Sequence, residues 1–275
     1  MDNYKYLKAF YNDKLVGTLA KTPDRLVAFE YDNEWLATGF SISPFSLPLQ
    51  KKVYLPKFEP FEGLFGVFND SLPDGWGRLL VDRLLLKNNI NPSEIDNLNR
   101  LAVVQESGMG ALTYKPEHRF ETPQEESYYD KLAQECSKIL ESQSSDNLDE
   151  LFKLGGSSGG ARPKILTKIN GEDWIIKFPS SQDPKYIGEQ EYKYSLVAKD
   201  CGIKMSETKL FDSKIYSGYF GIKRFDRENG KKVHMVSVSG LLETSHRLPN
   251  LDYNILMKLT LELTKNYQDI EQLYR

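Results

Sequence analysis

The sequence is poor in the residues that build metal sites and disulfide frameworks, with two cysteines and three histidines among 275 residues. Cys136 and Cys201 lie far apart and have no metal-ligand residues nearby, so we expect both to be buried packing residues in a reducing compartment. The histidines show neither the HExxH spacing nor a nearby carboxylate cluster. The sequence therefore predicts no metal site built on histidine.

An excess of charge of one sign is also missing, as are long apolar runs. Lys and Arg number 36 against 39 Asp and Glu, a net charge of -3 that leaves no positive excess for a phosphate backbone or an anionic lipid surface. No apolar run approaches the ~18 residues of a membrane span. The N-terminus lacks the charged-then-apolar order of a signal peptide. We therefore expect a cytoplasmic protein that binds neither nucleic acid directly nor a membrane.

What is present is typical of a globular protein of about two domains: 40% hydrophobic and 27% charged residues. The first part alternates between apolar and polar residues with turn residues between the runs, which predicts an antiparallel sheet followed by two helices and one more strand. The predicted strands cover 15–19, 26–31, 37–42 and 111–114, and the predicted helices cover 78–87 and 94–104.

The second part has a different order of elements. A helix is predicted over 128–141 and a loop over 142–147, and the domain boundary is expected between 117 and 150. A glycine-rich turn follows, then strands and helices in the order found in the small lobe of a protein kinase. The predicted strands are 165–169, 173–178, 207–211 and 219–225, and the predicted helices are 187–200 and 253–266. The fold class predicted is α+β.

The run from Gly155 to Lys164 is the sharpest local feature, with four glycines in six residues. Glycines let backbone N–H groups approach an anion closely, and the Ser, Arg and Lys beside them add donors for phosphate. The same run could also be a flexible linker between domains. It matches neither the GxxxxGK[ST] loop nor GxGxxG.

Lys177 ends a strongly apolar predicted strand, where its charge either emerges to solvent or meets an anionic partner. Glu189 and Glu191 lie at the start of the next predicted helix. Either could pair with Lys177, or could be there because the helix dipole stabilises a negative charge at that end. A Lys–Glu pair that orients nucleotide phosphates is a kinase requirement. In that interpretation the main chain of Lys223 and Phe225 forms the hinge that binds adenine.

Five ordered segments of the sequence resemble the HipA family, the serine/threonine kinase toxins of bacterial toxin–antitoxin pairs. One is similar to the family's N-terminal F-x-N-x-L-P-[DE]-G signature, and the others contain the glycine-rich run, the lysine strand, the glutamate and the hinge. The segments are 65–78, 155–164, 174–179, 190–192 and 223–227, the last followed by 233–235.

The resemblance implies an N-terminal HipA-like subdomain over 1–116, a connecting helix and linker over 117–150, and a kinase-like ATP-binding lobe over 151–275. It implies ATP and Mg²⁺ as cofactors, a HipB-like DNA-binding antitoxin as partner and a protein substrate in translation. Ser157 matches the serine that is autophosphorylated in the family, and Glu191 matches the family's glutamate better than Glu189. The nucleotide-binding residues implied are Ser158, Gly159, Gly160, Ala161, Arg162, Lys164, Lys177, Glu191, Lys223 and Phe225.

The sequence departs from the family in one respect. The aspartate that orients the substrate hydroxyl and the Asn and Asp that bind Mg²⁺ have no match after Phe225, and by the resemblance they belong further along than Arg275. The resemblance therefore implies a truncated kinase that is inactive by itself. The alternative is a non-catalytic module that binds an antitoxin or a kinase partner. For that module we expect exposed apolar residues at Leu256, Leu259, Leu261 and Leu263.

Overall fold

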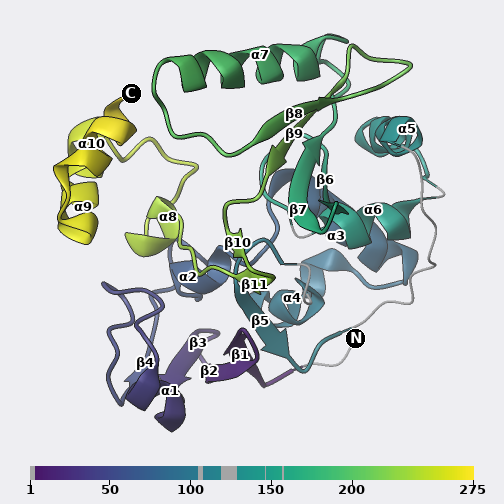
Figure 1. The fold of residues 1–275 in the computed structure, drawn as a ribbon. Coiled ribbons are helices and arrows are strands. Elements are labelled where there is room, and N and C mark those ends of the chain that lie inside the picture. The colour runs from purple at the N-terminus through teal and green to yellow at the C-terminus, as the bar shows by residue number, and fades with distance from the viewer. Residues whose placement is uncertain (1–3, 105–107, 119–128, 146, 157) are drawn as a thin grey trace.

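The computed structural model describes residues 4–104, 108–118, 129–145, 147–156 and 158–275 (Figure 1). It has the predicted α+β class, with two antiparallel sheets whose cores are joined by helices. The N-terminal sheet lies at the bottom of Figure 1 and the second sheet at the upper right.

The N-terminal sheet has the strand order β4-β3-β2-β1-β5. Its strands are β1 (Tyr6–Tyr11), β2 (Lys14–Lys21), β3 (Val27–Tyr31), β4 (Val53–Tyr54) and β5 (Leu112–Lys115). The β1–β2 turn holds two residues, Asn12 and Asp13, at φ values of 44° and 67°. Positive φ at both positions is the geometry of a type I′ hairpin, which Asn and Asp tolerate. The alternation in β1 buries Leu7 and Ala9 in the first core.

Helices interrupt this sheet in the sequence after β3 and after β4, and one replaces a predicted strand. They are α1 (Asn33–Thr38), α2 (Gly66–Asn69), the short 3₁₀ helix η1 (Pro92–Glu94) and α4 (Asn97–Val104). The strand prediction for 37–42 is wrong because Asp32 begins a helix: its side chain accepts a hydrogen bond from the amide of Glu34 at 2.8 Å, and Trp35 is buried. The helix predicted from 94 is divided between η1 and α4.

The second sheet has the order β6-β7-β9-β8. Its strands are β6 (Lys164–Ile169), β7 (Glu172–Lys177), β8 (Thr208–Phe211) and β9 (Tyr219–Lys223). The helix α7 (Ile187–Asp200) packs against β8 and β9 and crosses the top of the molecule in Figure 1. Two further helices, α5 (Tyr129–Leu140) and α6 (Leu148–Gly155), contribute to the core of this sheet.

The helix α3 (Gly75–Lys87) belongs to two apolar clusters at once. Trp76 and Leu80 pack with the core of the second sheet. Leu84 and Leu85 pack in a separate cluster with Val103 of α4 and with α6. A helix from the N-terminal part of the chain is therefore an integral part of the second core.

After the second sheet the chain returns toward the N-terminal sheet. It forms the short hairpin β10 (Arg227–Glu228) and β11 (Lys231–Lys232), then α8 (Val238–Leu241), α9 (Tyr253–Thr264) and α10 (Tyr267–Tyr274). The expectation of four exposed leucines on α9 is wrong for Leu259, which is buried, whereas Leu263 is 46% exposed. The cysteine prediction is similarly divided, since Cys136 is buried in the second core and Cys201 is exposed.

Candidate functional site

The glycine-rich run begins where α6 ends and is held by hydrogen bonds rather than extended as a linker. The hydroxyl of Ser158 donates to the carbonyl oxygen of Gly155 at 2.6 Å, and the Ser158 side chain is buried. Beyond this turn Gly160 and Ala161 are exposed. We call residues 158–162 the glycine loop. Ser157, the predicted autophosphorylation site, lies outside the described residues.

Lys164 lies beneath the glycine loop. It begins β6, is only 8% exposed, and donates a hydrogen bond from Nζ to the carbonyl oxygen of Gly159. Its register partner on β7 is Lys177, so the two lysines lie side by side. Burial, reinforced by the charge of Lys177, lowers the pKa of Lys164 to about 8. The loop is therefore held from below by a nearly buried lysine through the carbonyl oxygen of Gly159.

Lys177 pairs with a glutamate of α7. Its Nζ forms an ion pair with Oε1 of Glu191, and both side chains are about one-third exposed. The other candidate, Glu189, instead pairs with Lys193 one helical turn further on at 2.5 Å. The lysine at the end of β7 is thus linked to α7 by a single carboxylate, and that carboxylate belongs to Glu191.

Arg162 at the end of the glycine loop is already engaged. Its Nε and one terminal nitrogen donate to the two carboxylate oxygens of Asp183, each at 2.8 Å. The backbone N–H and hydroxyl of Ser180 donate to the same carboxylate. Arg162 therefore lowers the pKa of Asp183 well below its usual range.

An unpredicted residue, Asp74, contacts the glycine loop from the N-terminal part of the chain. Its Oδ1 accepts a hydrogen bond from the backbone N–H of Gly160, although 86 residues separate them. The carbonyl oxygen of Gly160 accepts from the backbone N–H of Trp76 at 2.9 Å. A Cβ on Gly77 would lie 2.2 Å from the carbonyl oxygen of Ser158, so only glycine allows α3 this close. The sequence does not predict this contact, because Asp74 and Gly160 are far apart in the chain and Asp74 has the position of an ordinary N-cap residue.

The predicted hinge is shaped by Arg224 rather than by the side chains of its neighbours. Phe225 is 72% exposed, and the side chain of Lys223 pairs with Glu172 on the sheet. The backbone N–H of Lys223 donates to the carbonyl oxygen of Glu207, so it is not available to an adenine ring. The groups left for a hinge role are the Lys223 carbonyl and the main chain of Phe225.

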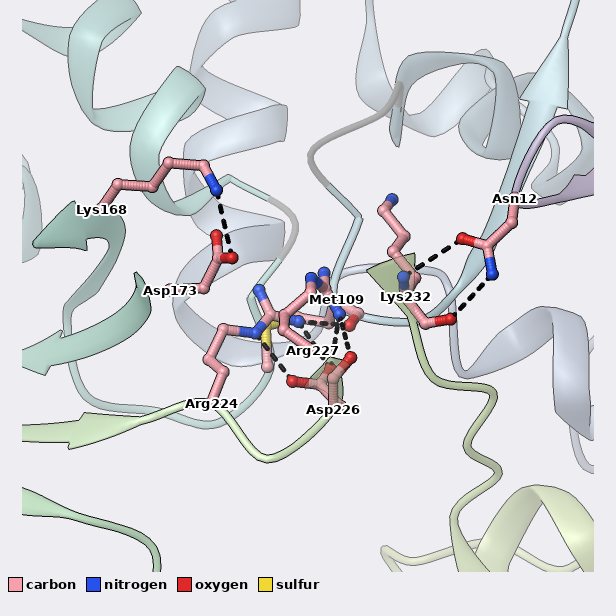
Figure 2. Close-up of polar contacts among 8 residues, drawn as sticks. All are labelled: Asn12, Met109, Lys168, Asp173, Arg224, Asp226, Arg227 and Lys232. Atoms are coloured by element: carbon pink, nitrogen blue, oxygen red, sulfur yellow. Dashed lines mark hydrogen bonds and ion pairs between the residues drawn. The ribbon is translucent and has the colours of Figure 1, made fainter. Parts of the chain in front are cut away.

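Figure 2 shows Asp226 between two arginines just past the hinge. Arg224 donates to both of its carboxylate oxygens at 2.8 and 2.7 Å, and Arg227 donates to one of them at 2.9 Å. Arg224 also donates to the carbonyl oxygen of Met109 in the N-terminal part of the chain, at 2.7 Å. Since Arg224 is buried and the Asp226 side chain is only 13% exposed, the chain leaves β9 in a fixed direction.

The segment after the hinge is tied to the N-terminal sheet and its helices at several points. Asn12 and Lys232 exchange two hydrogen bonds, at 3.0 and 3.1 Å, between the Asn12 amide and the Lys232 main chain (Figure 2). His234 contacts the carbonyl oxygen of Ile42 at 2.8 Å. Asp70 accepts hydrogen bonds from the backbone N–H and hydroxyl of Ser237. The N-terminal part thus contacts both the glycine loop and the chain beyond the hinge.

The four-stranded sheet, the glycine loop and the Lys177–Glu191 pair together have the arrangement of the small lobe of a protein kinase. Two family models match the chain: the HipA N-terminal domain over residues 7–115 and the HipA-like C-terminal domain over residues 156–275. The chain belongs to the HipA family, a toxin and kinase family.

Within the described residues, no cluster of His, Cys, Asp and Glu could hold a metal ion, and no helix has the length and apolar character needed to cross a bilayer.

Proposed function

We propose that the second sheet and the glycine loop form the ATP-binding site of a HipA-like serine/threonine kinase. The observation that carries the proposal is the ion pair of Lys177 with Glu191 beside a loop rich in glycine. In kinases the lysine of this pair binds the α- and β-phosphates and the glutamate on the helix orients it.

Each remaining donor near the loop has a role in this proposal. The exposed backbone of Gly160 and Ala161 would face the phosphates, and Arg162 and Lys164 would add positive charge at either end of the loop. The main chain of Phe225 and the carbonyl of Lys223 would bind the adenine edge. Mg²⁺ would enter with ATP, bound to the phosphate oxygens.

Residues 1–275 are proposed to bind the nucleotide, and phosphoryl transfer by these residues alone is not proposed. Transfer depends on an aspartate that orients the substrate hydroxyl and on Asn and Asp ligands for Mg²⁺. Asp226 is the first aspartate after the hinge, and it is buried between Arg224 and Arg227, where it serves the structure. Neither Asp252 nor Asp269 has the D-x-x-x-x-N spacing.

Family context extends the proposal to partners. Membership in the HipA family supports a HipB-type DNA-binding antitoxin as the partner. By the same resemblance, we propose a protein of the translation apparatus as the substrate. Co-purification with a co-expressed HipB-type protein tests the first of these. Failure of the two proteins to associate would remove the antitoxin from the proposal and leave nucleotide binding standing.

Calorimetric titration with ATP, with and without Mg²⁺, tests nucleotide binding directly. We expect wild-type protein to bind ATP and Lys177→Ala to lose at least tenfold in affinity, because the ion pair and the phosphate contact disappear together. Lys168→Ala is the matched control, since Lys168 is an exposed lysine of the same sheet that pairs with Asp173. Absence of heat from folded wild-type protein, or equal binding by Lys177→Ala, would contradict the proposal.

A further inference from the structure

Three donors around the glycine loop are occupied by carboxylates of the protein itself. Glu191 forms an ion pair with Lys177, and Asp183 forms one with Arg162. Asp74 accepts a hydrogen bond from the backbone N–H of Gly160. The first two carboxylates belong to the same lobe as the loop. Asp74 alone comes from the N-terminal domain, so its contact links that domain to the site.

The bonding of Asp74 is unusual for its place in the chain. An aspartate directly before a helix ordinarily accepts a hydrogen bond from an amide in the first turn. Asp74 precedes α3 with an extended backbone, yet its side chain makes no such capping bond and turns to Gly160 instead. The helix α3 therefore lacks a side-chain N-cap, and the Asp74 carboxylate is directed at the loop.

The peptide of Gly160 is held on both sides by this short stretch of chain. Asp74 accepts from its N–H side and the Trp76 amide donates to its carbonyl. Gly160 has φ of +82°, a left-handed conformation that favours glycine. The two contacts thus fix the backbone at an exposed residue of the glycine loop.

A carboxylate oxygen and a phosphate oxygen are the same kind of acceptor for a backbone amide. One N–H group has one proton, so a phosphate that binds Gly160 must displace Asp74, and the two negative charges also repel each other. We propose that Asp74 is a resident competitor for the nucleotide phosphate, through which the N-terminal domain lowers the affinity of the glycine loop. This inference rests on the proposed nucleotide site.

The structure also provides a second partner for the carboxylate. Nε2 of His246, in the segment after α8, lies 3.8 Å from Oδ2 of Asp74, on the oxygen that does not accept from Gly160. Lys164, beneath the loop, also contributes positive charge near Asp74. A released Asp74 carboxylate therefore still has an imidazole nitrogen beside its other oxygen.

Calorimetric titration with MgATP of wild type, Asp74→Asn and Asp74→Ala tests the competition. Asn keeps the shape and one acceptor but removes the charge, and Ala removes both. We expect the Kd to fall in the order wild type, Asp74→Asn, Asp74→Ala, with a decrease of about tenfold for Ala, equivalent to about 1.4 kcal/mol. Such a change corresponds to an amide that is free in about one molecule in ten of the wild type.

Asp24→Asn is the matched control, because Asp24 is an exposed aspartate in the β2–β3 turn of the same domain. Its Kd should equal that of wild type. An unchanged or weaker affinity of the Asp74 variants, with wild type binding normally, would overturn the competition and leave the nucleotide site intact. If neither wild type nor any variant bound MgATP, the nucleotide site itself would fail and the competition with it.

Amide hydrogen exchange supplies a readout that needs no nucleotide, and Asp74→Asn provides the comparison if Asp74→Ala folds poorly. Exchange in the peptide that contains Gly159–Arg162 should rise in the Asp74 variants, most in Asp74→Ala, and stay unchanged in Asp24→Asn. A folded Asp74→Ala protein without faster exchange there would show that this contact does not hold the loop, and the inference would be wrong.

Discussion

At the scale of single residues, Asp183 is the best example of a charge held by its surroundings. Its carboxylate receives Arg162 from the glycine loop and two hydrogen bonds from Ser180, and its side chain is only 11% exposed. Because Arg162 lowers its pKa, the folded protein favours the ionised form more than the unfolded chain does.

The sign of the pH dependence follows from this lowered pKa. The stabilisation by Asp183 is complete above the unfolded-state pKa of about 4 and is lost as the pH falls toward the lower folded-state value. We expect Asp183→Asn to reduce the free energy of unfolding by about 1 kcal/mol at pH 7, since Arg162 is half-exposed and screened by water.

Urea denaturation from pH 8 to pH 2 measures this effect. The difference between wild type and Asp183→Asn should be constant down to about pH 5 and shrink below about pH 4. Asp24→Asn again serves as the control for replacing an aspartate, at an exposed position. A gap that persists unchanged at pH 2 would mean that Asp183 stabilises the fold by packing and not by its charge.

Residue-level prediction from the sequence succeeded where a local pattern and a chemical need coincide. Lys177 ends an apolar strand, where its charge either emerges to solvent or meets an anionic partner, and in the structure Glu191 of the next helix is that partner. Asp74 could not be found in this way. Its neighbours predict a helix start, and its true contact depends on how α3 packs on α6, which the sequence does not reveal.

At the scale of elements, the β1–β2 turn serves two purposes. Its two residues have the positive φ values that a type I′ turn requires, and the side chain of Asn12 also reaches across to the main chain of Lys232 in β11. The amide of Asn12 offers one donor and one acceptor, as a strand neighbour would. The turn thus docks the β10–β11 hairpin on the N-terminal sheet.

Asn12→Gly separates these two purposes. Glycine keeps the backbone conformation of the turn and removes both hydrogen bonds, so we expect a loss of about 1 to 2 kcal/mol in the stability of the β10–β11 contact. Hydrogen exchange at Lys232 should rise about tenfold while the β1 and β2 amides stay protected. Asp13→Gly makes the same backbone change without that contact and should leave Lys232 unaffected. Equal exchange in the two variants would contradict this role of Asn12.

Most predicted strands and helices are found in the structure, short strands such as β3 and β8 included, and the errors are local. The helix at 187–200 matches α7 because its fourteen residues are bounded by clear breaks in the pattern. Residues 37–42 are an exception: a short alternating run has the same pattern as the end of a short helix, and the cap that Asp32 provides for α1 decides between them. The helix α6 went unassigned because the glycine run that follows it dominates the local composition.

At the scale of the whole molecule, α3 links the second core to α4, a helix with other residues in the first core. Trp76 and Leu80 are fully buried in the second core, although they belong to the part of the chain that the HipA N-terminal model matches. Burying two such side chains contributes about 3 to 6 kcal/mol. That amount is comparable with the whole stability of a typical domain, about 5 to 15 kcal/mol.

We therefore expect that residues 1–116 and 117–275, expressed as separate chains, expose apolar surface at the vacated α3 contact. Each fragment alone should bind the dye ANS, and mixing them should abolish the dye fluorescence and give a complex that co-elutes. The uncut protein is the control and should bind little dye. Two fragments that stay dye-free and separate would show that the cores are independent after all.

The shared helix also has a consequence for the order in which the protein is made. The ribosome releases α3 before α5, α6 and the second sheet exist, so Trp76 and Leu80 leave the exit tunnel without the residues that will cover them. The first sheet can fold early, but an apolar face persists beside it for the time needed to synthesise about another hundred residues, on the order of 5 to 20 seconds. During that interval the nascent chain is a substrate for chaperones that recognise exposed apolar helices, and slow translation between residues 88 and 178 would lengthen its exposure.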